Sequence, residues 1–234
     1  MKRLFLISIS LFTFAVSALE VDNFLGENRN LRDSSTIIND YINYEFDQKI
    51  NSLPLKILTN QSKCEKIHSK LVKQFRRFIV HKIADYLEGL LDKNYLFPSP
   101  NISDYEYYQK SIYNNGFFEI NRFVSLSRNI NVNGIIIGTD KLSHFISTGL
   151  RYHSFYKNMI AKGKSHRKAI EKIIRIGVFT ENTILGKMSS GVFSFGDLEA
   201  NYQGLLFNQK FCNNSENSYL AFENGIWKLA SPFD

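Results

Sequence analysis

The chain has few cysteines, one long apolar run and none of the short motifs that mark the common enzyme classes. A glycine-rich phosphate loop, a His-Glu-x-x-His zinc motif and a nucleophile elbow are all absent. Their absence argues against the nucleotide-hydrolysing, zincin and α/β-hydrolase classes that those motifs define. Internal repeats, linkers and low-complexity segments are also absent, so the chain does not have the sequence of a solenoid or a multidomain array.

The one long apolar run lies at the N-terminus and has the form of a secretory signal. Residues 1–3 read Met-Lys-Arg, residues 4–16 are mostly apolar, and Val-Ser-Ala at 16–18 resembles a cleavage site. We predict a signal peptide over residues 1–18, cleaved after Ala18, and a protein exported to the periplasm or cell envelope. The run is shorter than the about 20 residues of a spanning helix, and the alternative is an uncleaved anchor. No cysteine follows the run, which argues against a lipoprotein anchor.

Beyond residue 18, no window of the sequence is apolar enough to cross a membrane. Charged side chains interrupt the two best candidates, at Arg122 and Arg128 in one and at Lys172 and Arg175 in the other. We therefore expect residues 19–234 to form a single soluble or peripheral helical domain, which is long enough for one sizeable core.

Cysteine occurs only at positions 64 and 212. In an oxidising compartment an even pair suggests one disulfide, and we predict a bond between Cys64 and Cys212. In the chain-entropy treatment, closing a loop of that length stabilises the fold by roughly 5 kcal/mol at most. Two buried free thiols are the alternative.

Basic residues outnumber acidic ones, and the formal net charge is +7. Lys2 and Arg3 belong to the predicted signal, and the other basic residues are spread widely, with clusters at 76–77 and 162–172. In an exported protein this balance suits an anionic membrane surface or a phosphorylated envelope substrate, and not nucleic acid. The alternative is a solvated basic surface.

The three- and four-residue spacing of apolar side chains predicts that most of the chain is helical. The expected helices cover residues 35–50, 61–91, 139–160, 165–185 and 194–209. Asn133-Gly134 is a turn signal, and we expect a small extended or hairpin segment near 130–138. The predicted fold class is all-α, a mainly helical bundle with that small hairpin and with the helix over 61–91 as its spine.

Asp140 and His144 lie four residues apart and share one face of the expected helix over 139–160. A carboxylate and an imidazole in this relation can share a divalent metal ion, or the carboxylate can orient the ring. Lys141 points about 100° away and need not face the same centre, and Thr139 is the expected N-cap. The alternative is a carboxylate favoured by the helix dipole and a histidine satisfied in the core.

Glu181 continues an apolar helical face that runs from Ile170 through Ile174. Burying a carboxylate without a partner is costly. His144, Lys141 or a metal ion are the candidate partners, and the alternative is that this end of the helix is exposed.

A third polar segment begins at Ser194, which is expected to cap a helix with Asp197 at its third position. Asp197 and Asn201 share one face of that helix, although Asp197 can also serve only its own helix terminus. The three segments together predict a buried polar lattice in the helical core. Its expected members are Asp140, His144, Glu181, Asp197 and Asn201.

These residues carry a resemblance to a known pattern. Asp-Lys-x-x-His-Phe at 140–145, Glu181, and Ser-x-x-Asp-x-x-x-Asn-x-x-Gly at 194–204 resemble the VanZ-type pattern, and a similar order occurs in YfiM-type bacterial envelope lipoproteins. The resemblance covers residues 140–204, within a motif-bearing part of about 138–212. It implies a bacterial envelope protein whose helices bring the motif residues together, and it implies no particular reaction.

Two functions fit this pattern. In the first, the protein is a hydrolase or transferase that acts on a phosphorylated lipid or cell-wall intermediate. His144 is then a general base or metal ligand, and Asp140, Glu181 and Asp197 are metal ligands or orienting groups. A divalent metal would be held by Asp140, His144 and Glu181, and the substrate would be contacted by Lys141, Arg151, Ser194 and Asn201.

In the second function, the protein is a non-catalytic structural or interaction protein, and the same residues form a satisfied polar core. The remaining histidines are given no role: His153 and His166 are expected on the surface, and His68 and His81 belong to the helix over 61–91.

Overall fold

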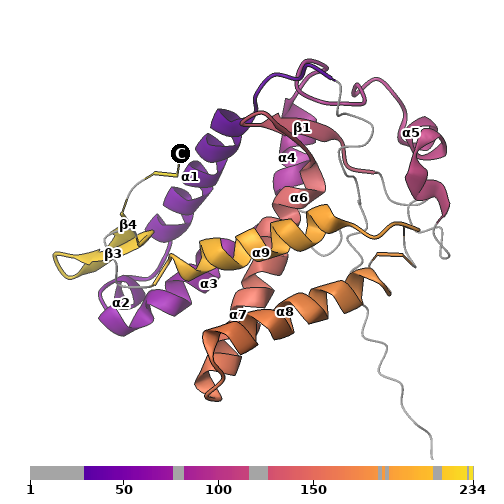
Figure 1. The fold of residues 1–234 in the computed structure, drawn as a ribbon. Coiled ribbons are helices and arrows are strands. Elements are labelled where there is room, and N and C mark those ends of the chain that lie inside the picture. Colours follow the sequence, from indigo (N-terminus) through magenta and orange to yellow (C-terminus); the bar gives the residue numbers. More distant parts are fainter. Residues whose placement is uncertain are drawn as a thin grey trace, which may run out of the picture.

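The computed structural model describes residues 29–75, 82–115, 126–183, 186–187, 190–212, 218–230 and 232–233. The predicted signal peptide over 1–18 lies outside these residues. The described part is mainly helical, as predicted, and contains two small antiparallel strand pairs (Figure 1). Within it, every helix is too short or too polar to cross a membrane.

The helices follow one another along the chain with short 3₁₀ turns between some of them. The first group is α1 (Ser35–Asn51), α2 (Leu55–Leu58), η2 (Gln61–Lys63), α3 (Cys64–Lys73), α4 (Lys82–Leu90), α5 (Asp104–Lys110) and η3 (Ile112–Asn115). The second group is α6 (Thr139–Ser143), η5 (His144–Thr148), α7 (Gly149–Ala161), α8 (His166–Glu181) and α9 (Phe195–Gln209). The strands are β1 (Asn129–Val132), β2 (Ile135–Gly138), β3 (Leu220–Glu223) and β4 (Ile226–Leu229).

The helix predicted over 139–160 is present as α6, η5 and α7 in direct succession, and η5 is a π-helical turn. Such turns are rare and occur often at functional sites. The expected N-cap was wrong by one residue, because Gly138 is the cap and the Thr139 hydroxyl donates to the Glu88 carboxylate. The path through α6, η5 and α7 crosses behind α9, and α8 packs beside α7 (Figure 1).

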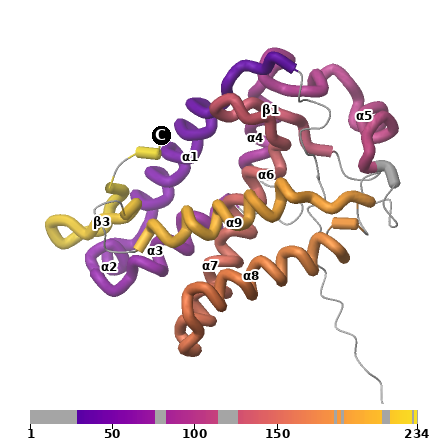
Figure 2. The backbone as a smooth tube through the Cα atoms, viewed as in Figure 1, coloured from indigo at the N-terminus to yellow at the C-terminus, as the bar shows by residue number. Residues whose placement is uncertain are grey.

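The spine predicted over 61–91 is not one helix. α3 ends at Lys73, and the next described helix, α4, begins at Lys82 in a different part of the molecule (Figure 2). At the end of α3 the Gln74 side chain donates to the Glu45 carbonyl oxygen of α1, 3.1 Å away. The apolar residues of this segment are buried as the spacing indicated, since Leu71 and Leu87 both lie in the core. They belong to two separate helices, α3 and α4.

The expected hairpin is β1 paired with β2, from Asn129 opposite Gly138 to Val132 opposite Ile135. Asn133 and Gly134 both have positive φ, 51° and 84°, as a two-residue turn between twisted strands requires. The second hairpin, β3 with β4, turns at another Asn-Gly pair with φ of 51° and 79°. The sequence signal for it is the same, since an Asn-Gly pair favours a turn with two positive φ angles.

One apolar core joins the N-terminal helices to the C-terminal segment. Phe46 of α1 packs against Phe211, and Phe233 packs against both. The chain end is fixed by paired hydrogen bonds of 2.9 and 2.8 Å between the Asn43 side chain and the Phe233 backbone. The predicted disulfide between Cys64 and Cys212 is confirmed, and it ties the start of α3 to the chain just after α9.

The crossing of α7 and α9 depends on two glycines. A Cβ on Gly149 would lie 2.5 Å from the backbone of Gly204, and a Cβ on Gly204 would overlap the carbonyl group of Phe145. Because these neighbours are backbone atoms, neither contact can be relieved by rotating a side chain. The close crossing brings the polar residues of η5 and α9 within hydrogen-bonding distance of one another.

We expect Gly204→Ala to lower the free energy of unfolding by about 1–3 kcal/mol, or more, because it overpacks this crossing. Gly89 of α4 is the matched control, since an added Cβ there meets nothing within 4 Å. Gly89→Ala should be neutral or stabilise the protein by up to about 1 kcal/mol. Urea unfolding of the two variants measures both values, and equal stabilities would contradict the close crossing.

Candidate functional site

The N-terminus of α9 sets the position of two of the predicted site residues. The Ser194 hydroxyl accepts a hydrogen bond of 3.0 Å from the backbone N–H of Asp197, so the predicted cap is confirmed. This cap directs Asp197 and Asn201 toward α6 and η5, and both residues are buried. Ser194 is itself fully buried, and its hydroxyl contributes to the cap.

The buried ammonium of Lys141 lies at the centre of the site. Its Nζ is 2.9 Å from Asp140 Oδ2 and 2.5 Å from Asp197 Oδ1. The expectation that Lys141 need not face this centre was wrong. Its long side chain extends from α6 and reaches both carboxylates. One cation therefore joins a carboxylate on α6 to one on α9.

The His144 imidazole extends the same set of contacts. Its Nε2 lies 3.1 Å from Asp197 Oδ2, and its Nδ1 lies 3.2 Å from Asn201 Oδ1. Asn201 also hydrogen-bonds the Tyr152 side chain. We call Asp140, Lys141, His144, Asp197 and Asn201 the Lys141 network. His144 is its most accessible member, with 21% of the side chain exposed against 3% for Asp197.

The two carboxylates of the network differ in their electrostatics. Burial raises the pKa of Asp140 to about 6, against the effect of the Lys141 ammonium. Burial acts on Asp197 in the same direction, but His144 and Lys141 outweigh it and hold the pKa of Asp197 below its usual value. Asp197 is therefore the ionised partner of Lys141 and His144, while the charge of Asp140 is costly.

A second polar layer lies behind the network and was not predicted from the sequence. Glu88 of α4 accepts hydrogen bonds from the Thr139 hydroxyl and from the backbone N–H of Arg128, the latter at 3.0 Å. Burial raises the pKa of Glu88. The buried Tyr107 hydroxyl donates to the Ser127 carbonyl, and burial raises the pKa of this phenol too. The Glu88–Thr139 contact holds the start of α6 against α4, and the Tyr107 contact holds α5 against the chain just before β1.

Glu181 is buried, as predicted, but on a different helical face. The inward residues of α8 are Ala169, Ile173, Gly177 and Glu181, whereas Ile174 is 43% exposed. An added Cβ on Gly177 would overlap the Tyr152 hydroxyl, so α8 packs closely on α7 here. Burial raises the pKa of Tyr152 to about 12, and its neutral side chain connects this region with Asn201.

The remaining predicted residue, Arg151, is exposed on α7 and does not belong to the buried network. Among the described residues at this site, the side chains whose ligand atoms lie within 4.8 Å of one another are those of Asp140, His144 and Asp197. The predicted set had Glu181 where the structure has Asp197. The Lys141 ammonium already bridges the two carboxylates. A divalent cation on these oxygens would have to displace it, so the donor set fits an ammonium better than a metal.

An open apolar groove of about 570 Å³ adjoins the network. Its walls are β2, the helical path through α6 and η5, and the first turns of α9. The lining residues are Ile135, Ile136, Ile137, Gly138, Lys141, Leu142, Phe145, Phe193, Phe195, Gly196, Glu199, Ala200 and Gln203. Ile135 and Phe195 are 66% and 76% exposed. No motif predicted this groove, because its apolar residues come from three separate segments.

No known protein family matches the chain, and no curated protein or solved structure matches it either. The resemblance to VanZ-type and YfiM-type proteins therefore stays a prediction.

Proposed function

We propose that this chain is an exported envelope protein that binds the apolar tail of an anionic amphiphile, such as a phosphorylated lipid, in the groove beside the Lys141 network. The observation that carries the proposal is the groove itself, with a volume of about 570 Å³ and a mainly apolar lining. That volume lies within the usual range for ligand sites. Contiguous apolar surface left open to solvent is also typical of binding sites.

The polar groups at the groove favour a hydrocarbon occupant. Lys141 is held by Asp140 and Asp197, and the Gln203 amide donates to the Glu199 carboxylate at 2.7 Å. A polar ligand buried between these groups would find few free hydrogen-bonding partners, which is costly. An alkyl chain needs none and gains from leaving water.

Two positive features support an anionic partner, one at the groove and one on a separate surface. Lys187 is exposed, with its ammonium 6.0 Å from the ring centroid of Phe193 at the groove wall. The second feature is a basic recess of about 420 Å³ at the α7–α8 turn, lined by Met159, Lys162, Lys164, Lys168, Glu171, Lys172 and Arg175. Next to it on α8, Val178 and Phe179 are exposed. Exposed apolar and basic side chains on one helix favour an anionic membrane surface.

Export is supported by the disulfide, because such bonds persist in oxidising compartments. The VanZ-type resemblance points to the same location. In this proposal the Lys141 network is structural: it fixes α6 and η5 against α9 and so holds two walls of the groove in place.

A second candidate function is hydrolysis of the bound amphiphile. The observation that favours it is the partial exposure of His144 beside the ionised Asp197, an arrangement that can serve acid–base catalysis. Phosphate release from an alkyl phosphate that is lost in His144→Ala, while tail binding is retained, would establish it.

The binding proposal predicts opposite behaviour of two exposed phenylalanines. Phe195 lines the groove, and Phe179 lies on α8 outside it. We expect Phe195→Ser to weaken binding of a monomeric fluorescent alkyl phosphate about 10-fold or more, since burying such a side chain is worth roughly 1.5–3 kcal/mol. Phe179→Ser should leave this affinity within about twofold but weaken association with anionic vesicles.

Fluorescence titration and vesicle sedimentation measure these two properties separately. Equal affinities for the alkyl phosphate in wild type and Phe195→Ser, or no saturable binding in wild type, would contradict the groove as the tail site.

A further inference from the structure

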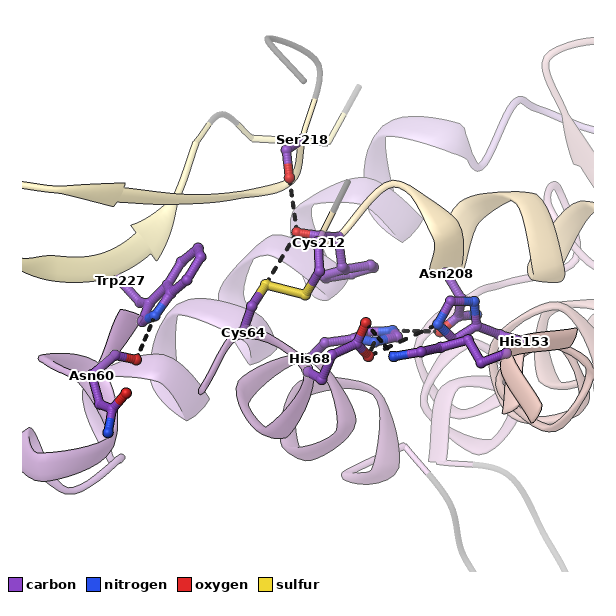
Figure 3. Close-up of a disulfide and its surroundings, with 11 residues drawn as sticks. Asn60, Cys64, His68, His153, Asn208, Cys212, Ser218 and Trp227 are labelled. Carbon is purple, nitrogen blue, oxygen red and sulfur yellow. Dashed lines mark hydrogen bonds and ion pairs between the residues drawn. A yellow bond between two sulfur atoms is a disulfide. The ribbon is translucent and has the colours of Figure 1, made fainter. Parts of the chain in front are cut away.

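A second group of ionisable side chains lies between α3 and α7, beside the disulfide. Glu65 and His68 stand one turn apart on α3, and His153 faces them from α7. Glu65 Oε2 is 3.8 Å from His68 Nδ1 and 4.0 Å from His153 Nε2. Figure 3 shows His68, His153 and Asn208 gathered next to the Cys64–Cys212 bond. We call Glu65, His68 and His153 the Glu65 site.

The orientation of His68 is set by Asn208. The Asn208 amide nitrogen donates to the Gly204 carbonyl at 2.7 Å, so its Oδ1 faces His68 Nε2, also at 2.7 Å. This carbonyl oxygen can only accept, and His68 Nε2 therefore carries a hydrogen. The ring is stacked on Phe211 with centroids 4.4 Å apart. In the neutral ring the lone pair of Nδ1 then points toward the Glu65 carboxylate.

His153 has buried ring nitrogens without a hydrogen bond. Only 9% of its side chain is exposed, and neither Nδ1 nor Nε2 has a partner within hydrogen-bonding distance. The 4.0 Å separation from Glu65 is too long for a hydrogen bond. Burying two such groups without partners is costly, and a cation placed between the Glu65 carboxylate and the two imidazoles would give His153 a partner.

We propose that the Glu65 site binds a divalent transition metal ion of the zinc class through Glu65 Oε2, His68 Nδ1 and His153 Nε2. The ligating atoms all lie within 4.8 Å of one another. Two ligands on one zinc ion are each about 2.0–2.2 Å from it, so the site has to contract when the ion binds. Two imidazoles and a carboxylate are the donor types that zinc, cobalt and nickel prefer.

The surroundings of the site fit this role. Asn208 acts on His68 as the outer hydrogen-bond partner that metal-bound histidines usually have. Lys157 binds the other Glu65 oxygen at 2.5 Å, which leaves Oε2 for the metal. Glu65 is the accessible member, with 48% of its side chain exposed, so it can adjust and a water molecule can complete the coordination. The inference is independent of the amphiphile proposal.

The test uses the full chain with its disulfide intact, stripped of metal by a chelator and titrated with Co²⁺ and then Zn²⁺. We expect one Co²⁺ per chain with the visible absorption of a low-symmetry site, displaced by Zn²⁺, and a zinc-dependent rise in melting temperature. His153→Gln should weaken binding by more than about 100-fold, since changes in outer partners alone cost about 10–100-fold. Asn208→Ala should fall within that smaller range.

His144→Ala is the matched control, because it removes a histidine from the Lys141 network and leaves the Glu65 site intact. It should bind Co²⁺ as wild type does. Near-ultraviolet circular dichroism establishes that His153→Gln is folded. An absence of saturable Co²⁺ binding in wild type, or unchanged binding in folded His153→Gln, would overturn the proposal.

Discussion

Replacing Asp197 with asparagine should lower the free energy of unfolding at pH 7 by about 3–5 kcal/mol, the range for breaking a buried ion pair on one side. The Asp197 carboxylate is the common partner of the Lys141 ammonium, at 2.5 Å, and the His144 ring, at 3.1 Å. Without its charge, the buried cation is left with Asp140, whose ionisation is costly. Glu199→Gln on the exposed side of the same helix is the control and should change stability by less than about 0.5 kcal/mol.

The same substitution at Asp140 should behave differently, although both carboxylates contact Lys141. The pKa of Asp140 in the folded protein is raised to about 6 by burial. Because this pKa is raised, Asp140 contributes most to the free energy of unfolding below its unfolded-state pKa near 4. That contribution is lost as the pH rises through about 6. Asp140→Asn removes this loss, so the variant should be neutral or more stable than wild type at pH 7.

Asp197 follows the opposite sign, because its folded pKa is lowered. Its contribution is present above the unfolded pKa near 4 and is lost as the pH falls through the folded value. Urea unfolding of wild type, Asp140→Asn and Asp197→Asn between pH 4 and pH 7.5 separates the two. Equal losses in both variants at pH 7 would contradict the assignment of Asp197 as the ionised partner.

Removing the disulfide should have the other large effect. The double variant Cys64→Ser, Cys212→Ser releases a cross-link between residues 148 positions apart. The expected loss is about 2–5 kcal/mol, since long loops gain most from closure. Reduction of the wild-type protein is the control and should lower the denaturation midpoint to a similar degree. A loss below about 1 kcal/mol would show that packing of Phe211 and its neighbours already fixes this junction.

Local sequence patterns correctly predicted the parts of the fold that depend on residues close together in the chain. Asn133-Gly134 predicted the first hairpin because few residue pairs accept positive φ twice. The spacing of Ser194 and Asp197 predicted the start of α9 for the same kind of local reason. The disulfide followed from there being only two cysteines. Asp140 and His144 were placed correctly on one face because they share one helical path.

The remainder depends on contacts between distant segments. Ile174 and Val178 are apolar yet exposed on α8, so the apolar pattern indicated the wrong inward face. His153 was predicted on the surface and is buried, because its neighbours Glu65 and His68 come from a helix almost 90 positions earlier. No spacing rule relates such positions.

The groove is the central claim, and covalent labelling tests its location most directly. Wild-type protein is irradiated with an alkyl phosphate that carries a diazirine in its tail, and the labelled peptides are identified by mass spectrometry. The account predicts label within residues 135–145 and 193–203, suppressed by an excess of unlabelled alkyl phosphate. Label confined to α8, or label that the competitor does not reduce, would contradict it.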